Sequence, residues 1–294
     1  MMTLAPAAAA GTWQLGDRTV NRLGLGAMRL TGTGAFDEGT PSDRGRSVEV
    51  LRRAVALGVN HVDTAAFYFS ATRSANELVN TALTPYPDDL VIVTKVGPGR
   101  DPSGEWLPSA RPDQLRGQVE ENLRQLGLDQ LDVVNLRLQD SGSVAEHVGA
   151  LSDLRDAGLL RNIGISNARL RQVEEALGVA SVVCVQNRLA VDSAGAGSDD
   201  VLRFCGERGI AFVPFFAIAG SGRESGAGSE QNDAIRRVAR SHGVSAAQVR
   251  LAWTLHQGPH VLAIPGTGNP DHVADNVAAA ALRLSDEDLA ALSF

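Results

Sequence analysis

Three charged side chains lie at or near the ends of apolar, strand-like segments of this sequence. Asp63 ends HVD, Lys95 follows VIVT, Arg137 ends LDVVNLR, and Tyr68 comes five residues after Asp63. A carboxylate beside a lysine keeps the lysine charged, and a lysine ammonium beside a tyrosine hydroxyl stabilises the phenolate. The four residue types therefore suit proton transfer, provided that the fold brings them together.

Arg137 is the least expected of the four. Burying a guanidinium without partners is costly, so an arginine at the end of an interior strand calls for a partner or a ligand. Taken singly, each of the four is more often a helix cap, an ion-pair partner or a packing residue than a catalyst. Their convergence is what would favour a functional site.

The elements that must position these residues alternate along the chain. Helix-like segments such as SVEVLRRAVALG and RPDQLRGQVEENLRQLG separate strand-like ones such as HVDTA, VIVTKV and LDVVNLRL, as far as VLAIPG. Repeated strand–helix units predict a parallel sheet with helices outside, and about eight of them over ~250 residues is the size of a barrel. We therefore predict an α/β fold, a (β/α)8 TIM barrel preceded by a hairpin that turns at Gly16-Asp17 and followed by additional C-terminal helices.

The alternative fold, a doubly wound sheet, needs a glycine fingerprint. GLGAMRLTGTG has arginine where that fingerprint requires its third glycine. No linker divides the chain, so we expect a single domain over residues 1–294, with residues 1–11 as a disordered leader that lacks signal-peptide features. Because barrel strands end at one rim, where barrel enzymes carry their active sites, we expect Asp63, Tyr68, Lys95 and Arg137 to meet there.

Composition limits the partners and the compartment. The 294 residues are 44% hydrophobic and 21% charged, with a formal net charge of −7, which argues against nucleic-acid and anionic-membrane partners. No apolar run approaches the ~18–20 residues of a membrane helix. Cys184 and Cys205 lie in unrelated contexts, so we expect no disulfide, no metal site and a cytoplasmic location. A monomer is the default expectation for a barrel, and an oligomer is the alternative.

Several motifs together resemble one enzyme family. DTAAFY, VTK, GISN, VQN and IPGTGNPDHVADN, in this order between about residue 24 and residue 276, resemble the aldo-keto reductases. The resemblance implies reduction of an aldehyde or ketone by hydride transfer from a nicotinamide cofactor, with a catalytic tetrad of Asp, Tyr, Lys and His. Asp63, Tyr68 and Lys95 match the first three, with Tyr68 as proton donor. Arg137 stands where the histidine belongs, and would hydrogen-bond the carbonyl oxygen or hold an anionic group beside it.

The resemblance also implies a set of cofactor contacts. Ser166, Asn167 and Gln186 would bind the carboxamide, Phe215 would stack on the nicotinamide, and His272 would face the 2′-phosphate. We expect NADPH in preference to NADH, although the family's usual Lys or Arg for that phosphate is absent; Arg223 is a substitute. The implied cofactor residues are Gly26, Met28, Ser166, Asn167, Gln186, Phe215, Ala217, Ile218, Ala219, Gly220, Ser221, Gly266, Thr267, Gly268, Asn269, His272, Asp275 and Asn276.

The substrate is narrowed by a closer resemblance. MRLTG, DDLVIVTKVG, WLP and LDVVNLRL look most like a bacterial subgroup of the family that includes pyridoxal reductases. Pyridoxal carries an ionisable hydroxyl oxygen on its ring, beside the aldehyde. Arg137 could pair with this oxygen once it is ionised. The alternatives are a tailoring ketoreductase of secondary metabolism, or a nicotinamide-binding sensor with little turnover. Expected pocket walls are Arg29, Phe36, Phe67, Phe69 and Trp106.

Overall fold

The computed structural model describes residues 6–32, 40–191, 198–218 and 233–292 of the chain. The strands are β1 Thr12–Leu15, β2 Arg18–Asn21, β3 Leu25–Gly26, β4 His61–Asp63, β5 Phe69–Ser70, β6 Arg73–Ser74, β7 Val91–Val96, β8 Leu131–Arg137, β9 Leu160–Ser166, β10 Val182–Gln186 and β11 Ala211–Phe212. The α-helices are α1 Arg44–Ala56, α2 Ala75–Leu83, α3 Leu115–Leu126, α4 Ala145–Asp156, α5 Leu170–Val179, α6 Asp199–Glu207, α7 Asp233–His242, α8 Ala246–His256, α9 Pro270–Ala278 and α10 Asp286–Ala291. Short 3-10 helices are η1 Pro6–Ala10, η2 Met28–Leu30, η3 Pro112–Gln114 and η6 Ala279–Ala281.

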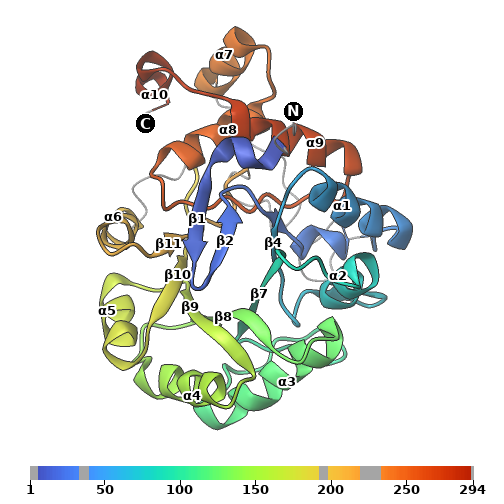
Figure 1. Cartoon of the computed structure of the whole chain (residues 1–294), viewed down its shortest axis with the longest axis vertical. Coiled ribbons are helices and arrows are strands. Elements are labelled where there is room, and N and C mark those ends of the chain that lie inside the picture. Colours follow the sequence, from blue (N-terminus) through green and yellow to red (C-terminus); the bar gives the residue numbers. More distant parts are fainter. Residues whose placement is uncertain (1–5, 33–39, 192–197, 219–232, 293–294) are drawn as a thin grey trace.

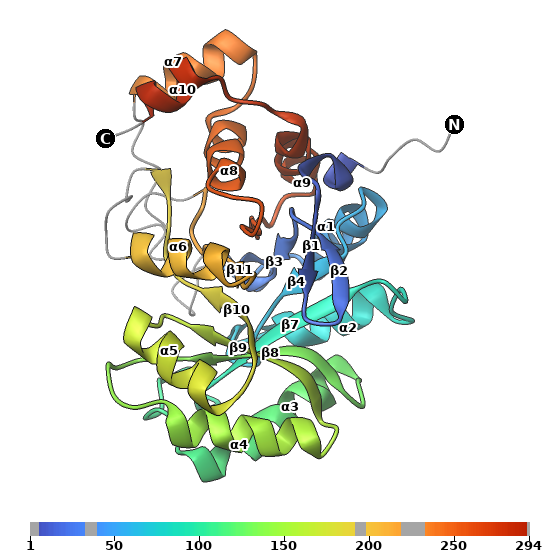
Figure 2. The same ribbon diagram turned by 60° about the vertical axis from the view of Figure 1, so that its left-hand side comes forward.

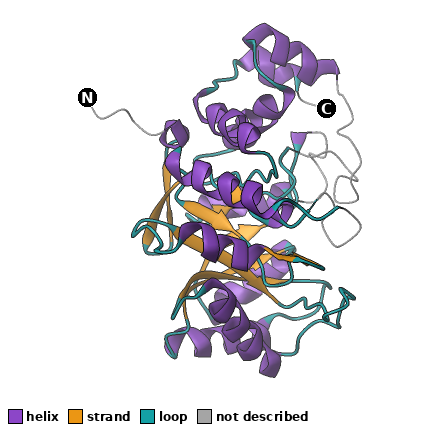
Figure 3. Ribbon diagram, turned by 90° about the vertical axis from the view of Figure 1, so that its right-hand side faces the viewer, coloured by secondary structure: helices purple, strands orange, loops and turns teal. Residues whose placement is uncertain are grey.

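A parallel sheet curls into a barrel at the centre of the molecule. Its order is β11-β10-β9-β8-β7-β4-β3, and consecutive strands are parallel. The segment VLAIPG over residues 261–266 fills the eighth position, through single bridges to β11 at Val261 and to the β3 region at Ala263 and Gly266. Helices surround the strands (Figures 1 and 3), which confirms the predicted (β/α)8 barrel. The eighth strand is reduced to isolated bridges.

Two apolar layers hold this arrangement together. The smaller one fills the barrel and includes Val91, Val93 and Val133 from the strands with Leu15 and Val20 from the hairpin. The larger one lies between the outer faces of the strands and the helices. The interior of the barrel is therefore a packed core below its rim.

The predicted N-terminal hairpin closes the floor of the barrel. β1 and β2 pair antiparallel across Gly16-Asp17, with Gly16 at φ +66°. Arg22, just after the hairpin, donates to the carbonyls of Ala10, Val261, Leu255 and Gly258, and so ties the hairpin to the closing segment.

The prediction of a disordered leader is wrong for residues 6–10. They form η1, in which Ala7 is fully buried and the Ala7 amide donates to the Leu57 carbonyl at 3.1 Å. The alanine run has small side chains that pack closely against η6 and α9, a tertiary contact that the local sequence does not reveal. Residues 1–5 lie outside the described ranges.

The additional C-terminal helices are present. α10 begins at a capping box formed by Ser285 and Asp288, as its sequence suggests. It lies beside α7, away from the barrel strands (Figure 2), and Asp288 pairs with His242 of α7 at 2.9 Å. Within the described ranges, every helix is too short or too polar to cross a membrane.

Candidate active site

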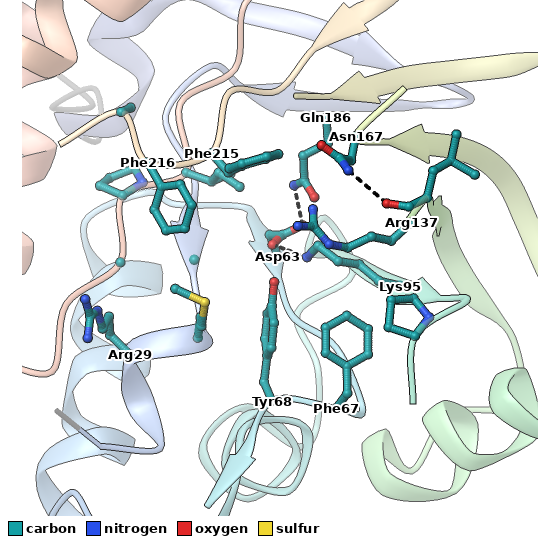
Figure 4. Close-up of a pocket in the computed structure, with 18 of the residues that line it drawn as sticks. Arg29, Asp63, Phe67, Tyr68, Lys95, Arg137, Asn167, Gln186, Phe215 and Phe216 are labelled. Atoms are coloured by element: carbon teal, nitrogen blue, oxygen red, sulfur yellow. Dashed lines mark hydrogen bonds and ion pairs between the residues drawn. The ribbon is translucent and has the colours of Figure 1, made fainter. Parts of the chain in front are cut away.

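A buried ion pair lies at the C-terminal rim of the barrel (Figure 4). The Lys95 ammonium donates to Asp63 Oδ1 at 2.5 Å and to the Thr64 carbonyl at 3.0 Å, and the two charged side chains are 2% and 6% exposed. Gln186 Nε2 donates to the other oxygen, Asp63 Oδ2, at 2.8 Å. Burial alone would lower the pKa of Lys95, but attraction to Asp63 and to Tyr68 outweighs burial and raises the pKa above its ordinary 10.5. Lys95 is therefore held charged.

Tyr68 reaches this pair from the loop that follows β4. Its hydroxyl points toward Asp63 and Lys95, and the Lys95 nitrogen lies 4.9 Å from the centre of its ring. The Tyr68 amide donates to the Ala65 carbonyl, and the Tyr68 carbonyl accepts from Ala75 at the start of α2. The side chain is only 9% exposed. The expected convergence of Asp63, Tyr68 and Lys95 is thus present.

Arg137 ends β8, the strand that pairs directly with β7, which carries Lys95. Its Nη1 donates to Ser166 Oγ at 3.2 Å, and its guanidinium carbon lies 5.1 Å from the centre of the Phe215 ring. No carboxylate of the described residues forms an ion pair with Arg137. The arginine is half-buried and its positive charge is directed at a cavity rather than at a protein anion.

A single cavity of about 520 Å³ joins these groups. Its lining combines the charged side chains with aromatic ones. The predicted site residues in the lining are Gly26, Met28, Arg29, Asp63, Phe67, Tyr68, Lys95, Trp106, Arg137, Asn167, Gln186, Phe215, Ala217, Ile218 and Gly266. A polar floor with aromatic walls suits an organic ligand with a few polar groups.

Gln186 places a hydrogen-bond acceptor at the floor of this cavity, unpaired within the part of the chain that the structure describes. The side chain is 1% exposed, and its Oε1 has no hydrogen-bond partner among the described residues, although its Nε2 is bound to Asp63. A buried amide oxygen without a donor is costly, so a ligand that donates to it would be stabilised. Asn167 lies on the rim beside it, in the left-handed region at φ +60°, with Nδ2 donating to the Leu138 carbonyl.

Ser166, a predicted cofactor residue, is not among the residues that line the cavity. It is completely buried, and its hydroxyl oxygen accepts from Arg137. Phe69 also lies off the cavity: it borders a second hollow, between the loop at residues 98–111 and α3. Neither placement could be read from strand periodicity, because both depend on which neighbour covers the side chain.

The remaining predicted cofactor residues surround the start of α9. Asn269 caps this helix by accepting from the Asp271 amide, and Thr267 Oγ1 accepts from the Asn269 amide at 3.0 Å and lies 3.5 Å from His272 Nδ1. Gly268 adjoins them in this turn, Asn276 is buried, and Asp275 is exposed. The N-terminal end of a helix favours an anion. The predicted residues Phe36, Ala219, Gly220, Ser221 and Arg223 lie outside the described residues.

Gly26 and Gly266 are required for the barrel to close beside the cavity. A Cβ on Gly26 would lie 2.8 Å from the Ile264 carbonyl oxygen, and one on Gly266 would lie 3.0 Å from the Gly26 carbonyl oxygen. A side chain at Gly26 would clash with the closing segment, and one at Gly266 would force its neighbour to shift by a few tenths of an ångström. This packing explains Gly26 and Gly266 without reference to a ligand.

Some residues of the site were not predicted. Phe216, at φ +64°, and Pro98 line the cavity, and Arg100 contacts the loop that carries Tyr68. Phe216 adjoins the predicted Phe215 and could have been included for that reason. Arg100 lies in a loop of ordinary composition, and no local pattern in the sequence marks it.

A buried polar network lies behind the ion pair. Thr64 Oγ1 donates to Asn76 Oδ1, Asn76 Nδ2 donates to Asn122 Oδ1, and Thr94 Oγ1 donates to the same oxygen. All four side chains are fully buried. The network joins β4 and β7 to α2 and α3, so it fixes the backbone on which Asp63 and Lys95 are mounted.

Comparison with known proteins agrees with this geometry. The model of the aldo/keto reductase family matches residues 22–293. Pyridoxine 4-dehydrogenase from Escherichia coli strain K12 is 43% identical over 288 residues, which cover 96% of each chain. Methylglyoxal reductase from the same strain is 29% identical over 98% of this chain and 89% of its own.

Solved structures show the same fold. An aldo-keto reductase from Klebsiella pneumoniae in complex with NADPH superposes with a TM-score of 0.77 at 27% identity, over 96% of this chain and 93% of its own. A thermostable aldo-keto reductase in complex with epalrestat has a TM-score of 0.79 at 28% identity, over 96% and 98%. The family resemblance and the barrel are both confirmed, and the chain belongs to the aldo-keto reductases, oxidoreductases of carbonyl and alcohol groups.

Proposed function

We propose that this protein reduces an aldehyde or ketone to an alcohol with NADPH, and that its preferred substrate is pyridoxal, which it converts to pyridoxine. The observation that carries the proposal is the buried pair of Lys95 and Asp63 directly below the Tyr68 hydroxyl, at the floor of an aromatic-walled cavity. An ion pair is costly to bury, and here it adjoins the hydroxyl that would transfer the proton.

Each residue has a separate part in the proposed reaction. A nicotinamide cofactor, when bound in this cavity, would supply the hydride for the carbonyl carbon. Tyr68 donates its hydroxyl proton to the carbonyl oxygen as negative charge develops there. Lys95 stabilises the resulting phenolate, and Asp63 keeps the ammonium charged and oriented through the 2.5 Å contact.

The residues around the cavity fit a nicotinamide cofactor. The unpartnered Gln186 Oε1 would accept from the carboxamide NH2, and Asn167 lies beside it. The Phe215 ring offers a face for stacking at the cavity wall. NADPH is favoured over NADH by the helix start at Asn269 with His272 close by, and the Klebsiella relative was crystallised with NADPH.

Arg137 is the reason for preferring pyridoxal among carbonyl substrates. It replaces the histidine of the usual tetrad with a permanent positive charge that no described carboxylate neutralises. The ring oxygen beside the aldehyde of pyridoxal ionises, and the guanidinium would bind it while Tyr68 protonates the aldehyde oxygen. The 43% identity to an E. coli pyridoxine 4-dehydrogenase supports the same substrate.

The whole chain is proposed to act as one barrel domain, monomeric and cytoplasmic. Cys184 and Cys205 are both buried free thiols, which fits a reducing compartment. Size-exclusion chromatography with light scattering tests the monomer, for which one peak near the chain mass of 30.9 kDa is expected.

The test of the reaction follows NADPH oxidation with pyridoxal and with aliphatic, aromatic and sugar carbonyls. Pyridoxal is expected to give the highest kcat/KM, and Tyr68→Phe is expected to lower kcat by at least about 100-fold, the usual scale of general-acid catalysis. Full activity in Tyr68→Phe would refute the proton-donor role. NADPH binding without turnover of any carbonyl would instead indicate a sensor.

The test of substrate recognition by Arg137 compares pyridoxal with pyridine-4-carbaldehyde, which lacks the ionisable hydroxyl oxygen on the ring. Arg137→Met is expected to lower kcat/KM for pyridoxal about 10- to 100-fold more than for the control aldehyde, since a charge-assisted hydrogen bond contributes roughly 1.5–3 kcal/mol. Arg137→Lys, which keeps the charge, should lose less. Equal losses for both aldehydes would exclude recognition of the ring oxygen by Arg137.

A further inference from the structure

Arg100 contacts the backbone on both sides of Tyr68. It lies four residues after the end of β7, and its Nη1 donates to the Phe69 carbonyl at 2.7 Å and approaches the Phe67 carbonyl at 3.4 Å. Tyr68 stands on a loop, so the position of its hydroxyl depends on how firmly this backbone is held. One guanidinium therefore binds the carbonyl groups of the two residues that flank Tyr68.

The same guanidinium also joins this loop to a wall of the cavity. Its carbon lies 4.4 Å from the centre of the Phe69 ring and 5.7 Å from that of Trp106. Trp106 is 45% exposed, lines the cavity, and lies 5.8 Å from Phe67, whose ring in turn meets the Tyr68 ring edge-on at 5.1 Å. A continuous row of rings thus runs from the cavity wall to Tyr68, beside Arg100.

The segment that presents Arg100 is held by its own hydrogen bonds. Gly99 and Leu107 are joined by a backbone hydrogen bond of 2.9 Å, and Arg100 and Trp106 form an antiparallel bridge. Arg100 Nε donates to the Gly104 carbonyl at 2.8 Å, across the same turn. Arg100 is therefore fixed at its base before it reaches the loop of Tyr68.

We propose that Arg100 is a positioning residue of the reaction, which fixes the Tyr68 hydroxyl over the carbonyl group through the Phe67 and Phe69 carbonyls and couples it to the Trp106 wall. This rests on the proposed role of Tyr68 as proton donor. Arginine suits the task because its planar fork donates to two carbonyls while its faces stack on rings. A displacement of about 1 Å in a reacting group can lower the rate by roughly 100-fold.

The experiment measures single-turnover hydride transfer to pyridoxal, by NADPH absorbance, in a double-mutant cycle of Arg100→Met and Tyr68→Phe. Arg100→Met alone is expected to slow hydride transfer about 10- to 100-fold, with the Kd for NADPH changed less than about threefold. In the Tyr68→Phe background it should add less than about threefold, because there is no longer a hydroxyl to position. Arg111→Met is the matched control: Arg111 belongs to the same loop, is exposed, pairs with Asp113, and should show wild-type rates.

Each outcome decides one of the two proposals. A wild-type rate in Arg100→Met, or the same loss with and without the Tyr68 hydroxyl, overturns the positioning role. A wild-type rate in Tyr68→Phe instead overturns the proposed function. If circular dichroism shows that Arg100→Met is unfolded, Arg100→Lys carries the same cycle; it is expected to slow hydride transfer about 3- to 30-fold, and an effect independent of the Tyr68 hydroxyl overturns the proposal.

Discussion

His61, buried in the barrel, should make the folding stability depend on pH. It belongs to β4, two residues before Asp63 and on the same inward face, and it is 1% exposed. Neither ring nitrogen has a hydrogen-bond partner of normal geometry among the described residues, and the ring lies against Gly24, where a Cβ would be 2.2 Å from Nε2. Burial lowers the pKa of His61 to about 4, and a weak contact with the Asn21 backbone offsets this only in part.

The sign and the size follow from linkage. The pKa is about 4 in the folded state and 6.5 in the unfolded chain, so between these values the unfolded chain binds more protons and stability falls as pH falls. Because a shift of one pKa unit corresponds to about 1.4 kcal/mol, His61 can lower the free energy of unfolding by at most about 3 kcal/mol. Between pH 7.5 and pH 5 the loss from this residue is about 2 kcal/mol, a large part of the ~5–15 kcal/mol of a typical domain.

Urea unfolding, followed by circular dichroism at several pH values from 7.5 to 5, measures this loss in the native chain and in His61→Leu. Leucine has a similar volume and does not titrate, and it leaves no polar nitrogen buried without a partner. The free energy of unfolding of the His61→Leu variant at pH 7.5 should equal or exceed that of the native chain. At pH 5 the variant should be more stable by about 2 kcal/mol beyond any difference at pH 7.5. Parallel pH dependence in the two proteins would refute the reasoning, since other titrating groups are shared.

Two further substitutions test the floor of the active site and the barrel core beneath it. Asp63→Asn leaves the Lys95 ammonium buried without its carboxylate, so we expect a loss of roughly 3–5 kcal/mol in urea unfolding and a fall in kcat, and an unchanged kcat would contradict the proposed support of Lys95. Gly164→Ala places a Cβ 2.1 Å from Asn135 Oδ1 and 2.6 Å from Cys184 Sγ, so calorimetry should show a Tm lower by several degrees, for a cost of roughly 1–3 kcal/mol. Adding Cys184→Ala should restore part of that Tm, whereas no recovery would show that Asn135 alone accounts for the strain.

The sequence by itself predicted the barrel and the convergence of Asp63, Lys95 and Tyr68, which the structure shows. Strand–helix alternation is a local pattern, and parallel strands with short connections place all C-terminal ends at one rim. Asp63, Lys95 and Arg137 lie at or near the ends of three consecutive strand-like segments. The sequence therefore predicted that their side chains meet at that rim. The family motifs then assigned Tyr68 to the same site.

Only the tertiary structure decided which side chains around that rim face the cavity. Ser166 is covered by Arg137, Phe69 turns to a second hollow, and Arg100 reaches the Tyr68 loop from a separate segment. The alanine run at residues 6–10 is ordered by helices from the other end of the chain. Each of these outcomes depends on contacts between residues distant in sequence, whose energies leave no periodic or compositional signal in the local chain.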